Sequence, residues 1–254
     1  MLLCIDIGNT NIKCAIINDD TIIAKTRLGT DPSKTSDEYL VNLYTLLAIS
    51  KLNSHDITDA IISSVVPKLT STFEKTIQSL FNIDSLIIGP GIKTGLNILL
   101  DDPATLGSDL VAACVAVINL YSSPAIMISL GTASVSCVID KNKNMRGGLI
   151  SPGIEISLEG LTNKSALLPS IDLRAPKSVI GKNTIDCMKS GIVLGEACKI
   201  DGLIDKIEEE LDEKCTVIAT GGLSKSIIPN CTHDIIIDED LIIKGLQIIY
   251  NKNK

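Results

Sequence analysis

Aromatic side chains are scarce in this chain of 254 residues: tryptophan is absent, and aromatic residues make up 2% of the sequence. Proteins that bind single-stranded nucleic acid stack its bases on aromatic rings, and this sequence has few rings to offer. Apolar residues still make up 45% of the chain. The core must therefore be built from isoleucine, leucine, valine and alanine, which suits strands that are buried on both faces.

An excess of positive charge and long uncharged apolar runs are also lacking. The net charge of −7 disfavours a general binder of nucleic acid or of anionic membranes. No uncharged apolar run reaches about 18 residues, so we expect no transmembrane helix. The stretch MLLCIDIG has no basic region of the kind that opens a signal peptide. We therefore expect a cytoplasmic protein without nucleic-acid or membrane partners.

Closely spaced cysteines are missing as well. The eight cysteines are scattered, no two form a CxxC pair, and only two histidines accompany them, so the sequence does not predict a zinc site. Most of the cysteines lie in apolar runs, where a free thiol behaves as a small hydrophobic side chain. His55 and His233 lie in polar, loop-like stretches, and we interpret both as surface residues without partners.

Hydrophobic patterning predicts an α/β protein whose two halves resemble each other. In each half, three successive strands come first, and helices and strands follow. In the first half we expect strands at 2–7, 12–18, 21–27, 59–67 and 85–89, and helices at 35–50 and 68–81. In the second half we expect strands at 125–130, 134–140, 145–153 and 215–222, and helices near 153–165, 181–190, 191–211 and 238–252. This repetition predicts two domains of like topology around a cleft, residues 1–120 and residues 121–254.

The stretch DIGNTNIK, residues 6–13, places an acid at the end of a strand and then a Gly-Asn-Thr turn. Such a turn presents backbone N–H groups and a threonine hydroxyl to phosphate oxygens. The carboxylate of Asp6 can hold Mg²⁺ through water, because this ion keeps much of its hydration shell. A plain β-hairpin explains the same residues equally well.

Two later turns favour the phosphate-binding interpretation. LGTA, residues 130–133, again places glycine and threonine after a buried strand, and ATGGL, residues 219–223, places two glycines after another. Backbone without side chains allows an adenine or a ribose to lie close. Three glycine turns that each follow a strand indicate a nucleotide-binding protein.

Together, these three turns resemble the two phosphate motifs and the adenosine motif of the actin-like kinase superfamily. Five further stretches narrow the resemblance to the type III pantothenate kinases over nearly the full length. The stretches are SSVVP (63–67), GPGIKTGLNI (89–98), GSD (107–109), GGLISPGIEISLEGL (147–161) and PKSVIGKNT (176–184).

The resemblance implies two actin-like, ribonuclease H-like domains with mixed sheets around a nucleotide cleft, assembled as a homodimer. It implies an ATP- and Mg²⁺-dependent transferase that phosphorylates pantothenate to 4'-phosphopantothenate, the first step of coenzyme A biosynthesis. The family's ATP-binding residues match Asp6, Ile7, Gly8, Asn9, Thr10, Asn11, Ile12, Lys13 and Thr132. Its substrate-binding residues match Gly107, Ser108, Asp109, Leu110 and Thr184, and this threonine reaches pantothenate from the partner subunit in family members.

Asp109 matches the catalytic base of the family. A base near the attacking hydroxyl is what phosphoryl transfer requires, since the hydroxyl must lose its proton as the new bond forms. The local sequence GSDLVAACVAVI also reads as the start of a helix, where an aspartate is favoured by the helix dipole. A helix start and a catalytic role are compatible, because the helix can hold the carboxylate in place.

Two residues depart from the family pattern. Ser129 stands where the family has an acid that binds a monovalent cation, K⁺ or NH₄⁺, and a serine hydroxyl is a neutral and weaker ligand. Leu110 stands where members commonly carry an arginine for the carboxylate of pantothenate; Lys93, Lys177 and Lys182 are candidates to replace it. Both departures motivate an alternative, a weak or inactive paralogue that acts as a nucleotide-binding or regulatory protein.

Overall fold

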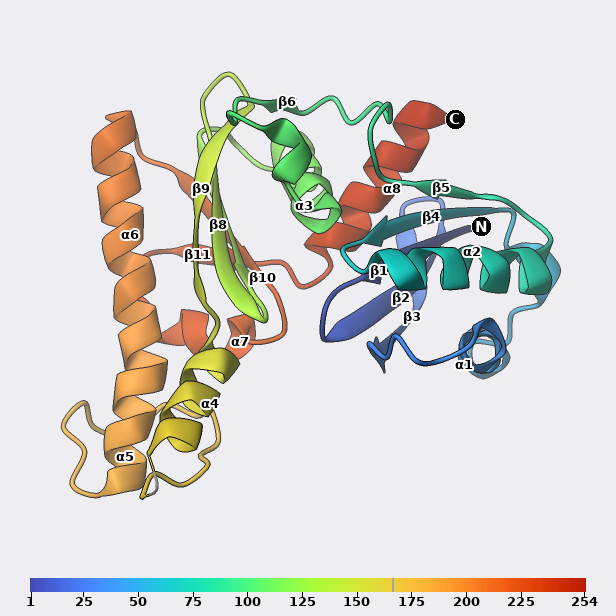
Figure 1. The fold of residues 1–254 in the computed structure, drawn as a ribbon. Helices are drawn as coiled ribbons and strands as arrows, with labels where there is room; N and C mark the ends of the chain where they lie inside the picture. The colour runs from blue at the N-terminus through green and yellow to red at the C-terminus, as the bar shows by residue number, and fades with distance from the viewer. Residues whose placement is uncertain (166) are drawn as a thin grey trace. The chain divides into compact units, whose positions relative to one another are not determined.

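The structure is a computed structural model that describes residues 1–165 and 167–254. The chain forms two compact units (Figure 1). Unit 1 consists of Met1–Gly95, Asp102–Ala116 and Leu241–Lys254, and unit 2 consists of Leu96–Asp101 and Val117–Asp240. The predicted α/β class with two mixed sheets is confirmed. The domain limits at residues 120 and 121 stay a prediction.

Unit 1 is built on a five-stranded sheet in the order β3-β2-β1-β4-β5. The first three strands in the chain form an antiparallel meander, and β4 and β5 then add in parallel to β1. The predicted strands are confirmed, except that 59–67 and 85–89 extend too far: β4 ends at Ser64 because Pro67 opens the next helix, and β5 ends at Ile87. The strands are β1 (Leu2–Ile7), β2 (Asn11–Asn18), β3 (Thr21–Gly29), β4 (Asp59–Ser64) and β5 (Ser85–Ile87).

Alternation along β1 divides the unit-1 sheet into two faces. Leu3, Ile5 and Ile7 pack into a core with α1 (Ser36–Ile49) and α2 (Pro67–Phe81). Thr35 caps α1 in a capping box with Glu38. The other face of β1 carries Cys4 and Asp6. The helices α3 (Ser108–Leu120) and α8 (Leu241–Asn253) approach each other closely, since a Cβ on Gly245 would lie 1.9 Å from the Ala112 carbonyl oxygen.

Unit 2 is built on a six-stranded sheet in the order β11-β10-β7-β8-β9-β6. Its meander of β7, β8 and β9 repeats the meander of unit 1, and β10 pairs in parallel with β7, as β4 does with β1. The strands are β6 (Asn97–Ile98), β7 (Ala125–Leu130), β8 (Ala133–Ile139), β9 (Asn144–Pro152), β10 (Thr216–Thr220) and β11 (Ile235–Ile237). Sequence patterning did not predict β6 and β11, which are two and three residues long.

Helices of unit 2 cover its sheet around an aliphatic core. The long α6 runs beside the sheet (orange in Figure 1), and its Ala197, Ile200 and Ile204 pack against Ile126, Ile128 and other residues of the strands. The helices are α4 (Ile154–Lys164), α5 (Thr184–Lys189), α6 (Gly195–Leu211) and α7 (Ser224–Ile227). A π-helical turn at Ser190–Leu194 joins α5 to α6. The boundary predicted between the helices 181–190 and 191–211 is therefore a change of helix type within a continuous helical segment.

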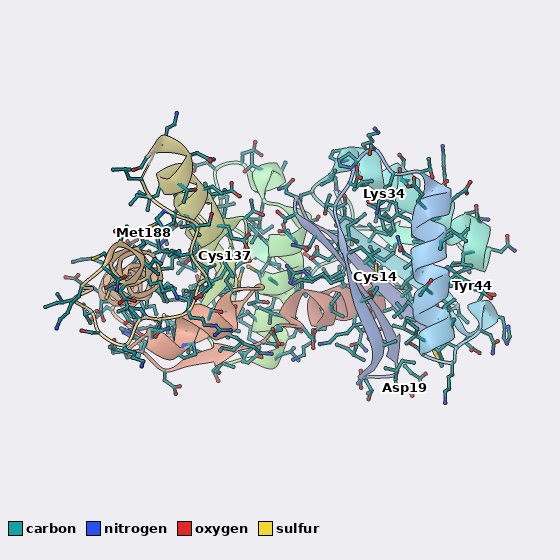
Figure 2. All side chains as sticks on the ribbon, turned by 90° about the horizontal axis from the view of Figure 1, so that it is seen from below. Cys14, Asp19, Lys34, Tyr44, Cys137 and Met188 are labelled. Atoms are coloured by element: carbon teal, nitrogen blue, oxygen red, sulfur yellow. The ribbon has the colours of Figure 1, made fainter. Side chains whose placement is uncertain are left out.

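Half of the cysteines follow the prediction that they behave as small hydrophobic residues. Cys4, Cys14, Cys114 and Cys137 are buried, and Figure 2 shows Cys14 within the strands of unit 1. Cys187 and Cys198 are exposed instead. No helix in the described part of the chain is long and apolar enough to cross a membrane.

Candidate active site

A row of polar side chains crosses the unit-1 sheet where β1 ends. Strand register places Asp6 opposite Lys13 of β2 on one side and opposite Ser63 of β4 on the other. Lys13 in turn lies opposite Arg27 of β3. Because residues opposite each other share a face of the sheet, these four side chains form one line. Sequence patterning identified Asp6 and Lys13, whereas Ser63 lay unassigned in the stretch SSVVP.

Asp6 is a buried carboxyl group, with 5% of its surface exposed. Its pKa is raised to about 6, chiefly by burial and then by the nearby negative charge of Asp109, while Lys13 and a hydrogen bond from Ser63 act in the opposite direction. Its Oδ1 atom has no hydrogen-bond partner among the described residues. A buried carboxylate oxygen of this kind needs a donor or a cation.

The Mg²⁺ ion of a kinase fits this site. Mg²⁺ prefers carboxylate and other hard oxygen ligands, and Asp6 offers such an oxygen with no protein donor bound to it. Asp6 also lies directly before the exposed turn that was predicted to hold phosphate, so an ion held there would face that turn.

The turn between β1 and β2 is fixed by its own backbone and by Thr30. The N–H of Gly8 donates to the carbonyl oxygen of Asn11 at 3.0 Å. Thr30, directly after β3, donates its hydroxyl to the Gly8 carbonyl oxygen at 2.7 Å and its N–H to the Thr10 carbonyl oxygen at 3.0 Å. Asn9 and Thr10 are exposed at the tip. Hydrogen bonds therefore fix the backbone of this turn, while its tip is exposed to solvent.

Asp109 lies in the first turn of α3, as its sequence predicts. Its side chain folds back toward Gly107: a Cβ added to Gly107 would lie 2.5 Å from the Asp109 Oδ1 atom. Burial raises the pKa of Asp109, while the N–H groups of Leu110 and Asp109 and the charge of Lys13 lower it. A carboxylate with a raised pKa is a better proton acceptor near neutral pH. Leu110, the next residue, is half-buried.

Serine hydroxyls join the end of β4 to the start of α3. The Oγ atoms of Ser63 and Ser108 lie 3.0 Å apart. The Ser108 Oγ atom also accepts from the Ser64 N–H at 3.0 Å and lies 3.1 Å from the Ser64 carbonyl oxygen. Unit 1 thus brings the predicted residues 6–13 and 107–110 into one site.

Unit 2 holds the other predicted turns, and glycines pack them together. A Cβ on Gly221, whose φ is +102°, would lie 2.3 Å from the Leu130 carbonyl oxygen. A Cβ on Gly153 would lie 2.2 Å from the Thr132 carbonyl oxygen, to which the Gly153 N–H donates. The predicted turns at Gly131 and Gly221 are therefore neighbours. Gly153, in the stretch ISPGIE, was not predicted to take part.

Ser129 is half-buried and lies opposite Thr220 in the sheet. The Thr220 Oγ1 atom is buried without a partner in the described structure. Two neutral hydroxyls therefore occupy the place where the family that the sequence resembles has a cation-binding acid. Thr184 is exposed at the start of α5, where Asn183 caps the helix.

The lysines considered as replacements for an arginine at position 110 lie in different settings. Lys93 is in unit 1, and its backbone N–H and carbonyl bond to Asn253. Lys177 and Lys182 line a pocket of about 540 Å³ in unit 2, together with Arg174 and Lys189. Lys189 is paired with Asp172 at 2.8 Å.

The interpretation of His233 as a residue without partners is wrong. Its Nδ1 lies 2.9 Å from Asp201 Oδ1 and its Nε2 lies 3.1 Å from Asp205 Oδ1, both on α6. Asp205, Glu208 and His233 also offer ligand atoms within 4.8 Å of one another. Glu208 already accepts from Lys214 Nζ and the Cys215 N–H. The group forms a hydrogen-bond network, which the helical spacing of acids on α6 could have suggested.

Comparison with known proteins agrees with this arrangement. The family model of type III pantothenate kinase matches residues 2–206. A type III pantothenate kinase of Halalkalibacterium halodurans is 43% identical over 253 residues, and one of Exiguobacterium sibiricum is 41% identical over 254 residues; each alignment covers both chains completely.

A solved structure also shares the fold. Component A of (R)-2-hydroxyglutaryl-CoA dehydratase from Acidaminococcus fermentans aligns with a TM-score of 0.58 at 14% identity, covering 100% of this chain and 99% of that one. The predicted actin-like fold is confirmed. The full-length similarity shows that the chain belongs to the type III pantothenate kinase family.

Proposed function

We propose that this chain transfers the γ-phosphate of ATP to the hydroxyl group of pantothenate, giving 4'-phosphopantothenate for coenzyme A biosynthesis. The observation that carries the proposal is the meeting of Asp6, Lys13 and Asp109 in unit 1, at the end of β1 and the start of α3. Phosphoryl transfer needs a metal-binding acid, positive charge near the phosphates and a base near the attacking oxygen. Full-length similarity to proteins named type III pantothenate kinase supports the same reaction.

Each group has a distinct task in this proposal. Asp6 would hold Mg²⁺ through water, and a bound ion there would supply positive charge for the phosphates. The exposed turn at residues 8–11 and Lys13 face the phosphates. Asp109 accepts the proton of the substrate hydroxyl, and its raised pKa suits that task. Residues 107–110 hold pantothenate, and Thr132 contacts ATP.

The assembly is also a proposal. We infer a cytoplasmic homodimer in which Thr184 of one subunit reaches the pantothenate bound by the other. The exposed position of Thr184 supports this role. At Ser129 we infer that a monovalent cation is not bound, because the neighbouring Thr220 adds no charge to the site.

An ADP-release assay with ATP, Mg²⁺ and pantothenate, with and without K⁺ or NH₄⁺, tests this function. Turnover should depend on pantothenate and should be insensitive to the monovalent cation. The Asp109→Asn variant should lose about 10²- to 10⁴-fold in kcat, the range for removal of a general base. Unchanged turnover in this variant would contradict the role of Asp109, and a folded wild-type protein without turnover would contradict the kinase itself.

A further inference from the structure

Ser63 lies beside the carboxyl group of Asp6, and none of the tasks described above uses it. The two residues are paired across the parallel strands β1 and β4, so their side chains project from the same face of the sheet. Ser63 is completely buried, its Oγ atom lies 3.0 Å from the Oγ atom of Ser108, and hydrogen bonding from its hydroxyl lowers the pKa of the neighbouring Asp6. Because it is buried away from water, the Ser63 hydroxyl can form hydrogen bonds only with neighbouring groups such as Ser108 and Asp6.

Counting protons shows how the two hydroxyls are arranged. Ser63 and Ser108 have one hydroxyl proton each, and the acceptors around them are the Asp6 carboxylate, the Ser64 carbonyl oxygen and each other's Oγ atoms. An ionised carboxylate is the strongest of these acceptors. With Asp6 ionised, Ser63 therefore donates toward Asp6, and Ser108, which accepts from the Ser64 N–H, has the Ser64 carbonyl oxygen and the Ser63 Oγ atom within reach of its own proton.

This chain of bonds connects the two carboxylates of the site. It runs from Asp6 through Ser63 to Ser108, and Ser108 is the first residue of α3, directly before Asp109. We propose that Ser63 is a positioning residue for phosphoryl transfer: its hydroxyl orients the Asp6 carboxyl group and, through Ser108, ties it to the helix turn that carries Asp109. This inference rests on the proposed kinase function.

The effect of removing the Ser63 hydroxyl follows from its position next to the carboxylate of Asp6, the proposed metal ligand. Hydrogen-bond partners that orient such ligands typically change metal affinity or activity by about 10- to 100-fold when they are removed. Because Ser63 lies beside Asp6 and touches the pantothenate-binding turn only through Ser108, its loss should lower kcat and weaken Mg²⁺ activation by a larger factor than it changes KM for pantothenate.

The test compares Ser63→Ala with a control that loses an equally buried hydroxyl elsewhere in unit 1. Thr76 is also completely buried, and its hydroxyl donates to the carbonyl oxygens of Ser36 and Thr72 in the helical layer. Ser63→Ala should reduce kcat by about 10- to 100-fold and raise the Mg²⁺ concentration for half-activation by a similar factor. Thr76→Val should lower the melting temperature without changing either quantity.

A second measurement separates this inference from the proposed function. The shift in melting temperature that Mg²⁺ adds in the presence of ATP should be smaller in Ser63→Ala than in the wild type, and Ser63→Ala should change nothing further in an Asp6→Asn background. A folded wild-type protein without pantothenate-dependent turnover would contradict the kinase proposal. In that case the shift in melting temperature that Mg²⁺ adds would still test whether Ser63 orients Asp6. Wild-type kcat and Mg²⁺ response in Ser63→Ala, or an equal loss of kcat in Thr76→Val, would overturn the inference.

Discussion

The turn after β1 and the turn after β7 have the same outline but are stabilised in different ways. Polar groups surround the first: Thr30 bonds its backbone, and Lys13 and Ser63 flank the acid before it. Close backbone contacts surround the second, where Gly153 and Gly221 leave no room for a Cβ. Charge is therefore concentrated at the turn of unit 1, whereas the turn of unit 2 depends on shape.

The two turns should therefore tolerate different substitutions. Asp6 costs stability, because a buried carboxylate is disfavoured, and so its retention points to a task in the reaction. The turn of unit 2 carries Ser129 in the corresponding place, which avoids that cost. A substitution by a side chain of similar size and shape should therefore be tolerated at Ser129 in unit 2, but not at Asp6 in unit 1.

The largest expected effect comes from making the first turn neutral like the second. Asp6→Asn should lower kcat/KM by about 100-fold or more, because the ligand for Mg²⁺ loses its charge. The same change should raise the free energy of unfolding at pH 7 by about 1–3 kcal/mol, since it removes a buried charge. Urea unfolding and the ADP-release assay measure the two effects, with Asp37→Asn on the exposed start of α1 as the control.

The gain in stability should depend on pH with a definite sign. The pKa of Asp6 is raised to about 6 from 3.8, so between these values the folded state binds more protons than the unfolded state. Wild-type stability from this group therefore falls as the pH rises from about 4 to about 6. The advantage of Asp6→Asn should be full above pH 6 and should vanish near pH 4; an advantage that grows on acidification would contradict this assignment.

Next in size is the effect of filling the space between the turns of unit 2. Gly221→Ala should lower the free energy of unfolding by more than about 2 kcal/mol, because it combines a positive φ with a backbone overlap. Gly202→Ala in α6, where nothing lies within 4 Å of the new Cβ, should instead be neutral or stabilising by up to about 1 kcal/mol. Similar stabilities for the two variants would show that the second turn does not depend on close packing.

The smallest effect is expected from giving the second turn an acid. Ser129→Asp should lower the melting temperature by a few degrees in choline chloride, since it places a carboxylate at a half-buried position. KCl at equal ionic strength should restore part of the loss, whereas the wild type should melt at the same temperature in both salts. A K⁺-dependent shift in the wild type would contradict the inference that Ser129 binds no cation.

Local sequence signals were sufficient for most elements of the fold. The apolar patterns of residues 35–50 and 68–81 and those of the meander from β7 to β9 all predicted elements that the structure contains. The strands β6 and β11 were not predicted from the sequence, and β6 has only two residues, which are too few to carry a period. The end of β4 was misplaced because VVP continues an apolar run into a helix that opens with proline.

Composition alone predicted an aliphatic core. Short stretches of sequence were enough to predict the three glycine turns and to identify Asp6 and Asp109 as candidate site residues, because each of these signals depends on residues within a few positions. Only the tertiary structure decided that Ser63 stands beside Asp6, that Gly153 and Gly221 pack against the turn at Gly131, and that His233 bonds to acids on α6. For Ser63 the physical reason is register, because strand pairing sets which distant side chains share a face of the sheet, whereas His233 meets its acids through the packing of a loop against α6.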